Sequence, residues 1–189
     1  MDDKILIEKI AAGDENAFKH FVEKYHQMVL NICNNILHNF DDSMDISQEV
    51  FIKIYESIDQ FRGDSKISTW LYRIAVNKSL NFLRSKKRSK WFSSLDLIFG
   101  DEKVQIDPLD DTLQPGEDME IDESKKLLHD ALKKLPEKQN AAIALSHFDE
   151  LSYKEIAEIM NISVSEVGVL INRGKNKLQK IIINYYKNH

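Results

Sequence analysis

One stretch of the sequence places an aromatic ring, two guanidinium groups and two amides along a single helix face. Apolar residues recur there with helical spacing, which predicts a helix over residues 68–87. An aromatic ring, amide groups and nearby cations are what an unstacked base and its phosphate strand require. Stacking is worth about 1–3 kcal/mol per base, similar to the cost of extruding a base from a duplex. We call this set the aromatic–amide stripe; its members are Trp70, Arg73, Asn77, Asn81 and Arg84.

A second set of polar residues follows two helix-start signals near the C-terminus. Ser152 with Glu155, and Ser163 with Glu166, both fit the capping box. Two helix starts eleven residues apart leave a short helix, a turn and a second helix, which is helix-turn-helix spacing. The second helix presents side-chain types that read base edges in the major groove. The candidate duplex-reading residues are Ser165, Glu166, Val169, Asn172, Arg173 and Asn176, with Lys175, Lys177 and Lys180 beside them for phosphates.

Each set also has a plainer interpretation. Trp70 alone fits core packing equally well, and Asn77 alone fits a surface amide without a role, so the first prediction depends on the whole stripe. A helical hairpin that only packs on its neighbour is the alternative for the second set. The two capping boxes together with the DNA-compatible face favour the helix-turn-helix.

Charge is distributed unevenly along the 189 residues, although the net charge is only −5. Residues 62–90 carry nine basic side chains and one acidic, whereas residues 91–123 carry eleven acidic and one basic. Residues 124–189 are again cationic, with a net charge of +4. Local patches rather than the net charge determine attraction to phosphates, so two nucleic-acid surfaces flanking an anionic segment remain possible. A solvated charge run is the alternative.

Hydrophobic periodicity predicts an all-α protein. A break with a helix N-cap falls at Gly13 and Asp14, and apolar residues then recur at spacings of three and four from Ala17 to Ile36. Residues 39–43 are a polar break. A four-residue repeat from Ile46 to Ile58 predicts the next helix, and a turn at residues 61–65 precedes the helix that carries the stripe. The buried side of that helix is predicted to hold Ile67, Leu71, Ile74, Ala75 and Phe82.

Helical periodicity fails between residues 91 and 122, where prolines, glycines and acidic residues concentrate. A structureless loop of that length is uncommon inside one compact domain. We therefore predict two small helical domains, residues 1–90 and 123–189, joined by an acidic flexible linker over 91–122, with the helix-turn-helix in the second.

Other kinds of function find no support in the sequence. The single cysteine, Cys33, excludes a disulfide framework and lies on an apolar helix, so a buried thiol is predicted. No histidine or acidic spacing fits a metal site, no glycine-rich phosphate loop is present and no catalytic constellation appears, so we expect no cofactor and no enzyme activity. No secretory leader or apolar run of membrane-spanning length is seen. The expectation is a soluble, cytoplasmic protein.

Several segments in order resemble the extracytoplasmic-function (ECF) sigma factors, the small two-domain group of the sigma-70 family. The segments 61–65 (FRGDS) and 68–77 (STWLYRIAVN) resemble region 2, as does 45–51 (DISQEVF) upstream. The segments 135–139 (LPEKQ) and 151–157 (LSYKEIA) resemble region 4, and the opening 13–18 (GDENAF) is similar too. The resemblance covers the chain except for the linker.

The resemblance implies an RNA polymerase sigma factor that binds promoter DNA. The helix around Asp45, Gln48, Glu49 and Phe51 would dock on the beta-prime clamp helices of the core polymerase, which also contains the beta subunit. The second helix of the helix-turn-helix would read the minus-thirty-five element as duplex. The linker would run toward the active-site channel, and an anti-sigma factor is an expected further partner. Strand melting at the minus-ten element would fall to the aromatic–amide stripe together with Phe61 and Arg62.

One segment departs from the family pattern. Residues 168–170 (GVL) of the recognition helix stand where relatives often carry a Lys-Ser-Arg-like run, so two phosphate contacts are missing or supplied elsewhere. Gly168 also costs roughly 1 kcal/mol of helix propensity relative to alanine. Two other classes remain open at this point: a free-standing helix-turn-helix regulator, which would leave the stripe unexplained, and a protein-interaction adaptor with no DNA role.

Overall fold

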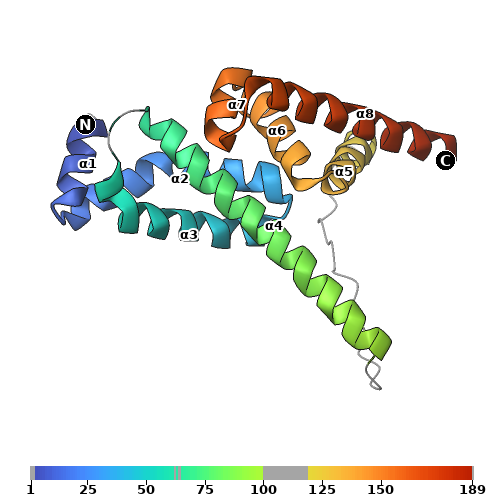
Figure 1. The fold of residues 1–189 in the computed structure, drawn as a ribbon, viewed down its shortest axis with the longest axis horizontal. Helices are drawn as coiled ribbons and strands as arrows, with labels where there is room; N and C mark the ends of the chain where they lie inside the picture. The colour runs from blue at the N-terminus through green and yellow to red at the C-terminus, as the bar shows by residue number, and fades with distance from the viewer. Residues whose placement is uncertain (1–2, 62, 64, 100–118, 189) are drawn as a thin grey trace.

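A computed structural model describes the backbone of residues 3–61, 63, 65–99 and 119–188, and the side chains of this set outside 90–125 and 188. Within these residues the chain is all helical (Figure 1). The N-terminal unit contains α1 (Asp3–Ala11), α2 (Glu15–Leu37), α3 (Phe40–Ser57), the short 3-10 helix η1 (Ile58–Gln60) and α4 (Ile67–Phe99). The C-terminal unit contains α5 (Met119–Lys133), α6 (Glu137–His147), α7 (Tyr153–Met160) and α8 (Val164–Asn188).

Local sequence signals set the starts of the N-terminal helices. Gly13 adopts a positive φ of 85°, and the Asp14 side chain accepts a hydrogen bond from the Ala17 amide at 3.0 Å to cap α2. Asn39 caps α3 in the same way through the Asp42 amide at 2.9 Å. The polar break predicted at 39–43 is therefore shorter than expected, because α3 already begins at Phe40.

The predicted apolar stripes form the core of this unit. Most of the predicted apolar positions of α2 are buried. All four residues of the predicted repeat from Ile46 to Ile58 are buried as well, and the last of them lies in η1. Cys33 is fully buried as predicted, and burial raises the pKa of its thiol to about 11. On α4, Ile67, Leu71 and Ala75 are buried, whereas Ile74 and Phe82 are only partly buried.

The helix-turn-helix forms as the capping boxes predict. The Glu155 amide donates to the Ser152 hydroxyl at 3.3 Å, and the Ser152 amide donates to the Glu155 carboxylate at 2.9 Å, which completes the box at α7. Helix α7 ends at Asn161 in the left-handed conformation with φ 52°, and the Ser163 hydroxyl accepts from the Glu166 amide at 3.1 Å to begin α8.

Helices α6 and α8 pack closely because α8 carries a glycine at the contact. A Cβ at Gly174 would lie 2.5 Å from Cδ1 of Ile143, so a larger residue would require the Ile143 side chain to move. Gly168 has no such role, since a Cβ there would meet only Tyr153 at 3.8 Å. The departure from the family pattern at residue 168 is thus not required by packing.

The two units share one core rather than lying apart. A single cluster of buried residues includes Leu71 and Val76 of α4 together with Ile156 and Ile159 of α7. Figure 1 shows α4 crossing beneath α6 and α7, while α2 and α3 cover its other side. Helix α4 is therefore buried from two directions over its first half, which a single amphipathic stripe does not predict.

Helices extend into both ends of the predicted linker. Helix α4 continues to Phe99, well past the predicted end near residue 87, and α5 begins at Met119 rather than near 123. Residues 91–99 contain neither glycine nor proline, so the loss of amphipathic period did not mean loss of helix. The remaining part of the predicted linker, 100–118, lies outside the described residues.

Candidate nucleic-acid interface

The outer half of the aromatic–amide stripe faces solvent along α4. Asn77, Asn81 and Arg84 are exposed, and the Arg84 guanidinium donates to the Asn81 side chain at 3.3 Å. The spacing of three and four residues places these groups on one helix face, as predicted. This part of α4 offers amide and guanidinium groups to a ligand without further rearrangement.

Trp70 stands at the inner end of the stripe and is partly buried. Its ring packs against that of Phe61, with the ring centroids 5.1 Å apart and the planes tilted by 48°. Phe61 also lines a cavity of about 690 Å³ between α1, α2 and the segment that leads into α4, together with Tyr25 and Lys66. The structure thus brings two of the predicted melting residues together beside a cavity that is large enough for a base. Arg62 falls outside the described residues.

Arg73 differs from the exposed stripe residues because its side chain, although 41% exposed, contacts another helix. Its Nε donates to the backbone oxygen of Glu158 at 3.0 Å, and its Nη2 lies 3.2 Å from the Glu158 carboxylate. Glu158 belongs to α7, so this guanidinium ties the N-terminal unit to the helix-turn-helix. In this arrangement, the Arg73 guanidinium binds Glu158 of the same chain.

The predicted duplex-reading face of α8 is presented as expected. Val167, Ile171 and Gly174 are buried toward α6 and α7. The opposite face is open, and all six candidates on it are exposed: Ser165, Glu166, Val169, Asn172, Arg173 and Asn176. The adjacent lysines, Lys175, Lys177 and Lys180, are exposed as well.

The α3 segment that resembles the polymerase-binding motif divides into surface and core. Asp45, Gln48 and Glu49 are exposed. Phe51 is only 6% exposed and packs edge-on against Phe21, so it holds the helix in place and offers no surface to a partner.

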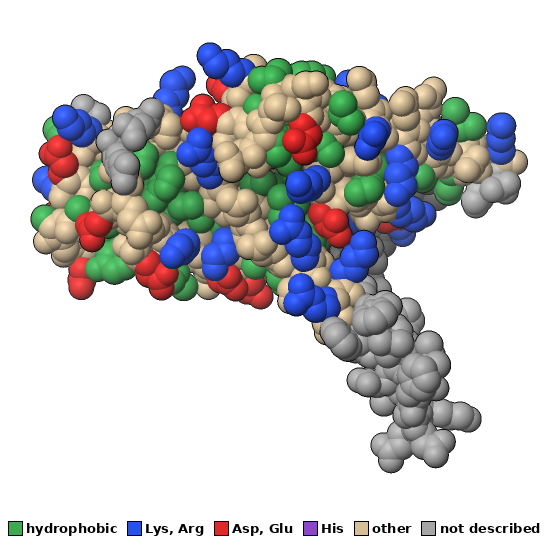
Figure 2. All heavy atoms as spheres, in the orientation of Figure 1, with side chains coloured by type: hydrophobic (Ala, Val, Ile, Leu, Met, Phe, Trp, Pro, Cys, Tyr) green, Lys and Arg blue, Asp and Glu red, His purple; other side chains and the backbone are tan. Residues whose placement is uncertain are grey.

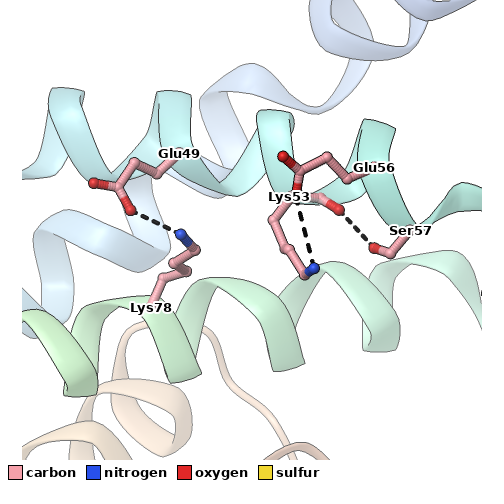
Figure 3. A network of polar contacts seen from close by, with 5 residues as sticks. All are labelled: Glu49, Lys53, Glu56, Ser57 and Lys78. Carbon is pink, nitrogen blue, oxygen red and sulfur yellow. Dashed lines mark hydrogen bonds and ion pairs between the residues drawn. The ribbon is translucent and has the colours of Figure 1, made fainter.

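Polar contacts fix the exposed side of α3 beside α4 (Figure 3). The Lys78 ammonium of α4 lies 2.8 Å from the Glu49 carboxylate. Within α3, Lys53 pairs with Glu56 at 3.7 Å, and the Ser57 hydroxyl donates to the Lys53 carbonyl. A partner that binds Glu49 therefore competes with Lys78.

A buried amide joins the two units. Asn140 of α6 is 4% exposed; its Oδ1 lies 2.9 Å from Nε2 of His38, and its Nδ2 donates to the Ile36 carbonyl at 2.8 Å. Burial lowers the pKa of His38 to about 4, and nearby positive charge, including that of Lys133, lowers it further. The hydrogen bond to Asn140 acts in the opposite direction but is the smaller effect. The imidazole is therefore neutral at pH 7, and the pair is a neutral hydrogen bond across the boundary.

Asp149 lies at the same boundary. Its carboxyl group lies near Tyr72 of α4 and Asn35 of α2, and burial raises its pKa to about 6 although these two side chains act to lower it. Burial and the Asp149 charge in turn raise the pKa of Tyr72. This contact adds a second polar link between the units.

Sequence reasoning did not find these boundary residues. His38 lacks any ligand spacing, and Asp149 stands near His147 before the helix-turn-helix without a motif. The one available signal was Asn140, a polar residue at the start of the apolar run 141–145, which is buried throughout. Burial on two sides of α6 explains why no single stripe marks it.

Among the described residues, no group of three or more His, Cys, Asp or Glu side chains could hold a metal ion. Nor does any helix in that part of the chain combine the length and the apolar character that a membrane span needs.

An exposed helix-turn-helix face, with a separate aromatic and amide face on another helix, is typical of a DNA-binding protein. Comparison with known families agrees with this class. Residues 21–89 match the family described as Sigma-70 region 2, and residues 125–178 match Sigma-70, region 4.

Proteins that match almost the whole chain are named as sigma factors too. The chain is 36% identical over 186 residues to the ECF RNA polymerase sigma-E factor of Escherichia coli strain K12, covering 96% of this chain and 97% of that protein. It is 33% identical over 180 residues to the RNA polymerase sigma-H factor of Pseudomonas aeruginosa, covering 95% and 93%. The chain belongs to the ECF group of the sigma-70 family of RNA polymerase sigma factors. The comparisons therefore support a sigma factor rather than a free-standing helix-turn-helix regulator.

Solved structures share the fold. CnrH, determined in complex with the cytosolic domain of CnrY, superposes with a TM-score of 0.63 at 21% identity, covering 96% of this chain and 97% of that chain. The sigma factor RpoE, determined with the anti-sigma factor NepR from Bartonella quintana, gives a TM-score of 0.61 at 22% identity, covering 87% and 96%.

Proposed function

We propose that this sigma factor divides promoter recognition between its two exposed faces, residue by residue. The α4 stripe, with Phe61 and Arg62, holds separated bases of the minus-ten element, and the α8 face reads the minus-thirty-five element as duplex. The observation that carries the proposal is the placement of these two chemically different faces on separate units. Amides and an aromatic ring suit unpaired bases, whereas Arg173 and the α8 amides suit base edges in a major groove.

Recognition of both elements requires the two units to separate. Elements centred about 25 base pairs apart lie about 85 Å apart along a duplex with a rise of 3.4 Å per base pair. In the packed arrangement, Arg73 of α4 touches Glu158 of α7, so the two faces cannot span that length. The 19 residues from 100 to 118 can extend to at most about 65 Å, which together with the helices is enough to bridge the elements. Opening also frees Arg73 for the promoter.

The exposed side of α3 is proposed as the docking surface for the beta-prime clamp helices of core polymerase. Asp45, Gln48 and Glu49 form this surface, and Phe51 supports it from the core. RNA synthesis itself belongs to the polymerase, and we assign no catalytic residue to this chain. The domains are proposed to be residues 1–90 and 123–189, with the acidic segment 91–122 between them serving as the tether.

Further partners follow from the family relationship. The fold neighbours CnrH and RpoE were each solved with a bound partner, and the partner of RpoE is an anti-sigma factor. We propose that an anti-sigma factor holds this chain too, and that the chain acts in the cytoplasm, where RNA polymerase works.

Replacement of Arg173 with alanine tests the duplex-reading role. Binding to a promoter duplex should weaken by about 1–3 kcal/mol at one upstream base pair, because a guanidinium that reads a guanine edge discriminates by that amount. Affinity should be measured across a set of single-base promoter variants. If the loss were the same for every sequence, Arg173 would be a phosphate contact instead.

Replacement of Asp45 with lysine tests the docking surface. We expect co-elution with core polymerase to fall at least tenfold, because the change reverses an exposed charge within the proposed contact. Lys19→Glu, a charge reversal on the exposed side of α2, is the matched control. Unchanged co-elution of the Asp45 variant, with both variants folded by circular dichroism, would remove α3 from the interface.

A further inference from the structure

The aromatic ring of Tyr153 lies beside the first turns of the recognition helix α8. Tyr153 is the first residue of α7, and it is 42% exposed. A Cβ built at Gly168 of α8 would lie 3.8 Å from Cε2 of this ring. Because residue 168 is a glycine, the edge of the ring that faces α8 is left uncovered.

Helix geometry places Gly168 at one edge of the duplex-reading face. At about 100° per residue, Gly168, Asn172 and Lys175 follow one another along a single line on α8. This line runs between the open face and the buried side, which holds Val167 and Ile171. The Tyr153 ring therefore stands at the start of an edge that carries the exposed Lys175 two turns further along.

The edges of a recognition helix meet a different part of DNA from its centre. Side chains in the centre of a helix in the major groove reach base edges, whereas those beside it reach the phosphate strands that border the groove. The first helix of a helix-turn-helix crosses this backbone. On the edge defined here, α8 itself offers no side chain at Gly168. The nearest polar group from α7 that could serve the same strand is the Tyr153 hydroxyl, a type of donor that commonly contacts phosphate.

We propose that the Tyr153 hydroxyl donates a hydrogen bond to a backbone phosphate of the minus-thirty-five element, in place of a contact that Gly168 cannot make. The inference rests on the duplex-reading role proposed for α8. The capping box between Ser152 and Glu155 fixes the first turn of α7, so the ring has a defined place when DNA binds. Figure 2 shows Lys and Arg side chains along the α8 side of the C-terminal unit, which attract the phosphate strand to this surface.

A tyrosine contact to phosphate has a signature that separates it from the other contacts of this face. A phosphate contact carries no sequence information, so its loss weakens binding to every promoter sequence alike. A neutral hydroxyl releases no counterion, so its loss leaves the salt dependence of binding unchanged, whereas loss of a lysine contact reduces that dependence. Arg173, which is proposed to read a base edge, should instead show losses confined to one base pair.

The hydroxyl is tested by Tyr153→Phe in the full chain assembled with core polymerase. We expect binding to promoter DNA to weaken about tenfold, the size of one hydrogen bond to a charged group, with the same salt dependence and an unchanged thermal unfolding midpoint. Tyr186→Phe is the matched control, because it removes the hydroxyl of a tyrosine that is 64% exposed near the far end of α8. The control should change binding less than twofold.

DNA with single neutral methylphosphonates along the minus-thirty-five element identifies the partner of the hydroxyl. At one position, the substitution should weaken binding of the wild type about tenfold and leave binding of the Tyr153→Phe variant nearly unchanged. A Tyr153→Phe variant that bound as tightly as Tyr186→Phe would overturn the proposal. A loss confined to particular base pairs would make Tyr153 a base reader, and a loss with an unchanged methylphosphonate profile would make its role structural; both results contradict the phosphate contact.

Arg173→Ala, measured in the same assay, separates this inference from the function on which it rests. A loss in the Arg173 variant together with full affinity in the Tyr153 variant would reject the phosphate contact and keep the duplex-reading role of α8. Full affinity in both variants would reject the role of the whole α8 face.

Discussion

Replacing Trp70 with alanine is expected to slow promoter opening by about 5- to 150-fold while changing closed-complex affinity less than threefold. The range corresponds to the 1–3 kcal/mol that stacking on an aromatic ring gives to one unpaired base. The stacking is available only after strands separate, so its loss falls on opening rather than on initial binding. Rates of opening should be followed by fluorescence of a base analogue in the minus-ten element, in the presence of core polymerase.

Two further variants separate stacking from structure. Trp70 is partly buried against Phe61, so alanine also costs packing, and Trp70→Phe should restore much of the opening rate by keeping an aromatic face. Asn77 is exposed, so Asn77→Ala should slow opening several-fold without changing thermal stability. Asn184→Ala removes an exposed amide at the far end of α8 and is the control. Equal losses in opening and closed-complex affinity would contradict the melting role.

Replacing Asn140 with alanine is expected to have the largest effect on the packed arrangement. The change leaves His38 and the Ile36 carbonyl buried without the hydrogen bonds that Asn140 makes. Each unsatisfied buried group costs about 1–3 kcal/mol, so the loss of two hydrogen bonds should weaken packing of the two units by about 2–6 kcal/mol. The readouts are the thermal unfolding midpoint and the transfer efficiency between dyes on α4 and α8.

A paired replacement distinguishes the hydrogen bond from simple loss of volume. His38→Leu combined with Asn140→Leu removes both partners and should recover part of the lost stability, because apolar replacement of a buried pair is often close to neutral. Asn172→Ala on the exposed face of α8 should leave packing unchanged. If Asn140→Ala behaved like Asn172→Ala, the buried amide would contribute nothing to the boundary.

Local signals in this chain predict the elements well because they act within a few residues. The capping-box patterns at Ser152 and Ser163 predict the starts of α7 and α8, and helical periodicity predicts the exposed face around Asn172 and Arg173. These features depend only on neighbours in sequence, so they could be predicted without knowledge of the packing between units.

Features that depend on distant partners could not be predicted in the same way. Arg73 has the spacing of a stripe residue, yet Glu158, 85 positions along the chain, determines its contacts. Phe51 lies within a binding motif but packs into the core, because it shares a face of α3 with the buried residues Ser47 and Ile54, four positions before it and three after it. The buried link between His38 and Asn140 joins two residues that no local pattern connects.

The distance between α4 and α8 in a promoter complex tests the central claim most directly. Labels at Ser85→Cys and Gln179→Cys lie on exposed positions outside the proposed contacts, and the native Cys33 is fully buried and should not react. In the free chain, the labels should report one short distance. With core polymerase and promoter DNA, the account predicts a distance of about 60–85 Å, set by the 3.4 Å rise per base pair between the two elements. A distance in an active promoter complex that stayed at the value of the free chain would contradict it.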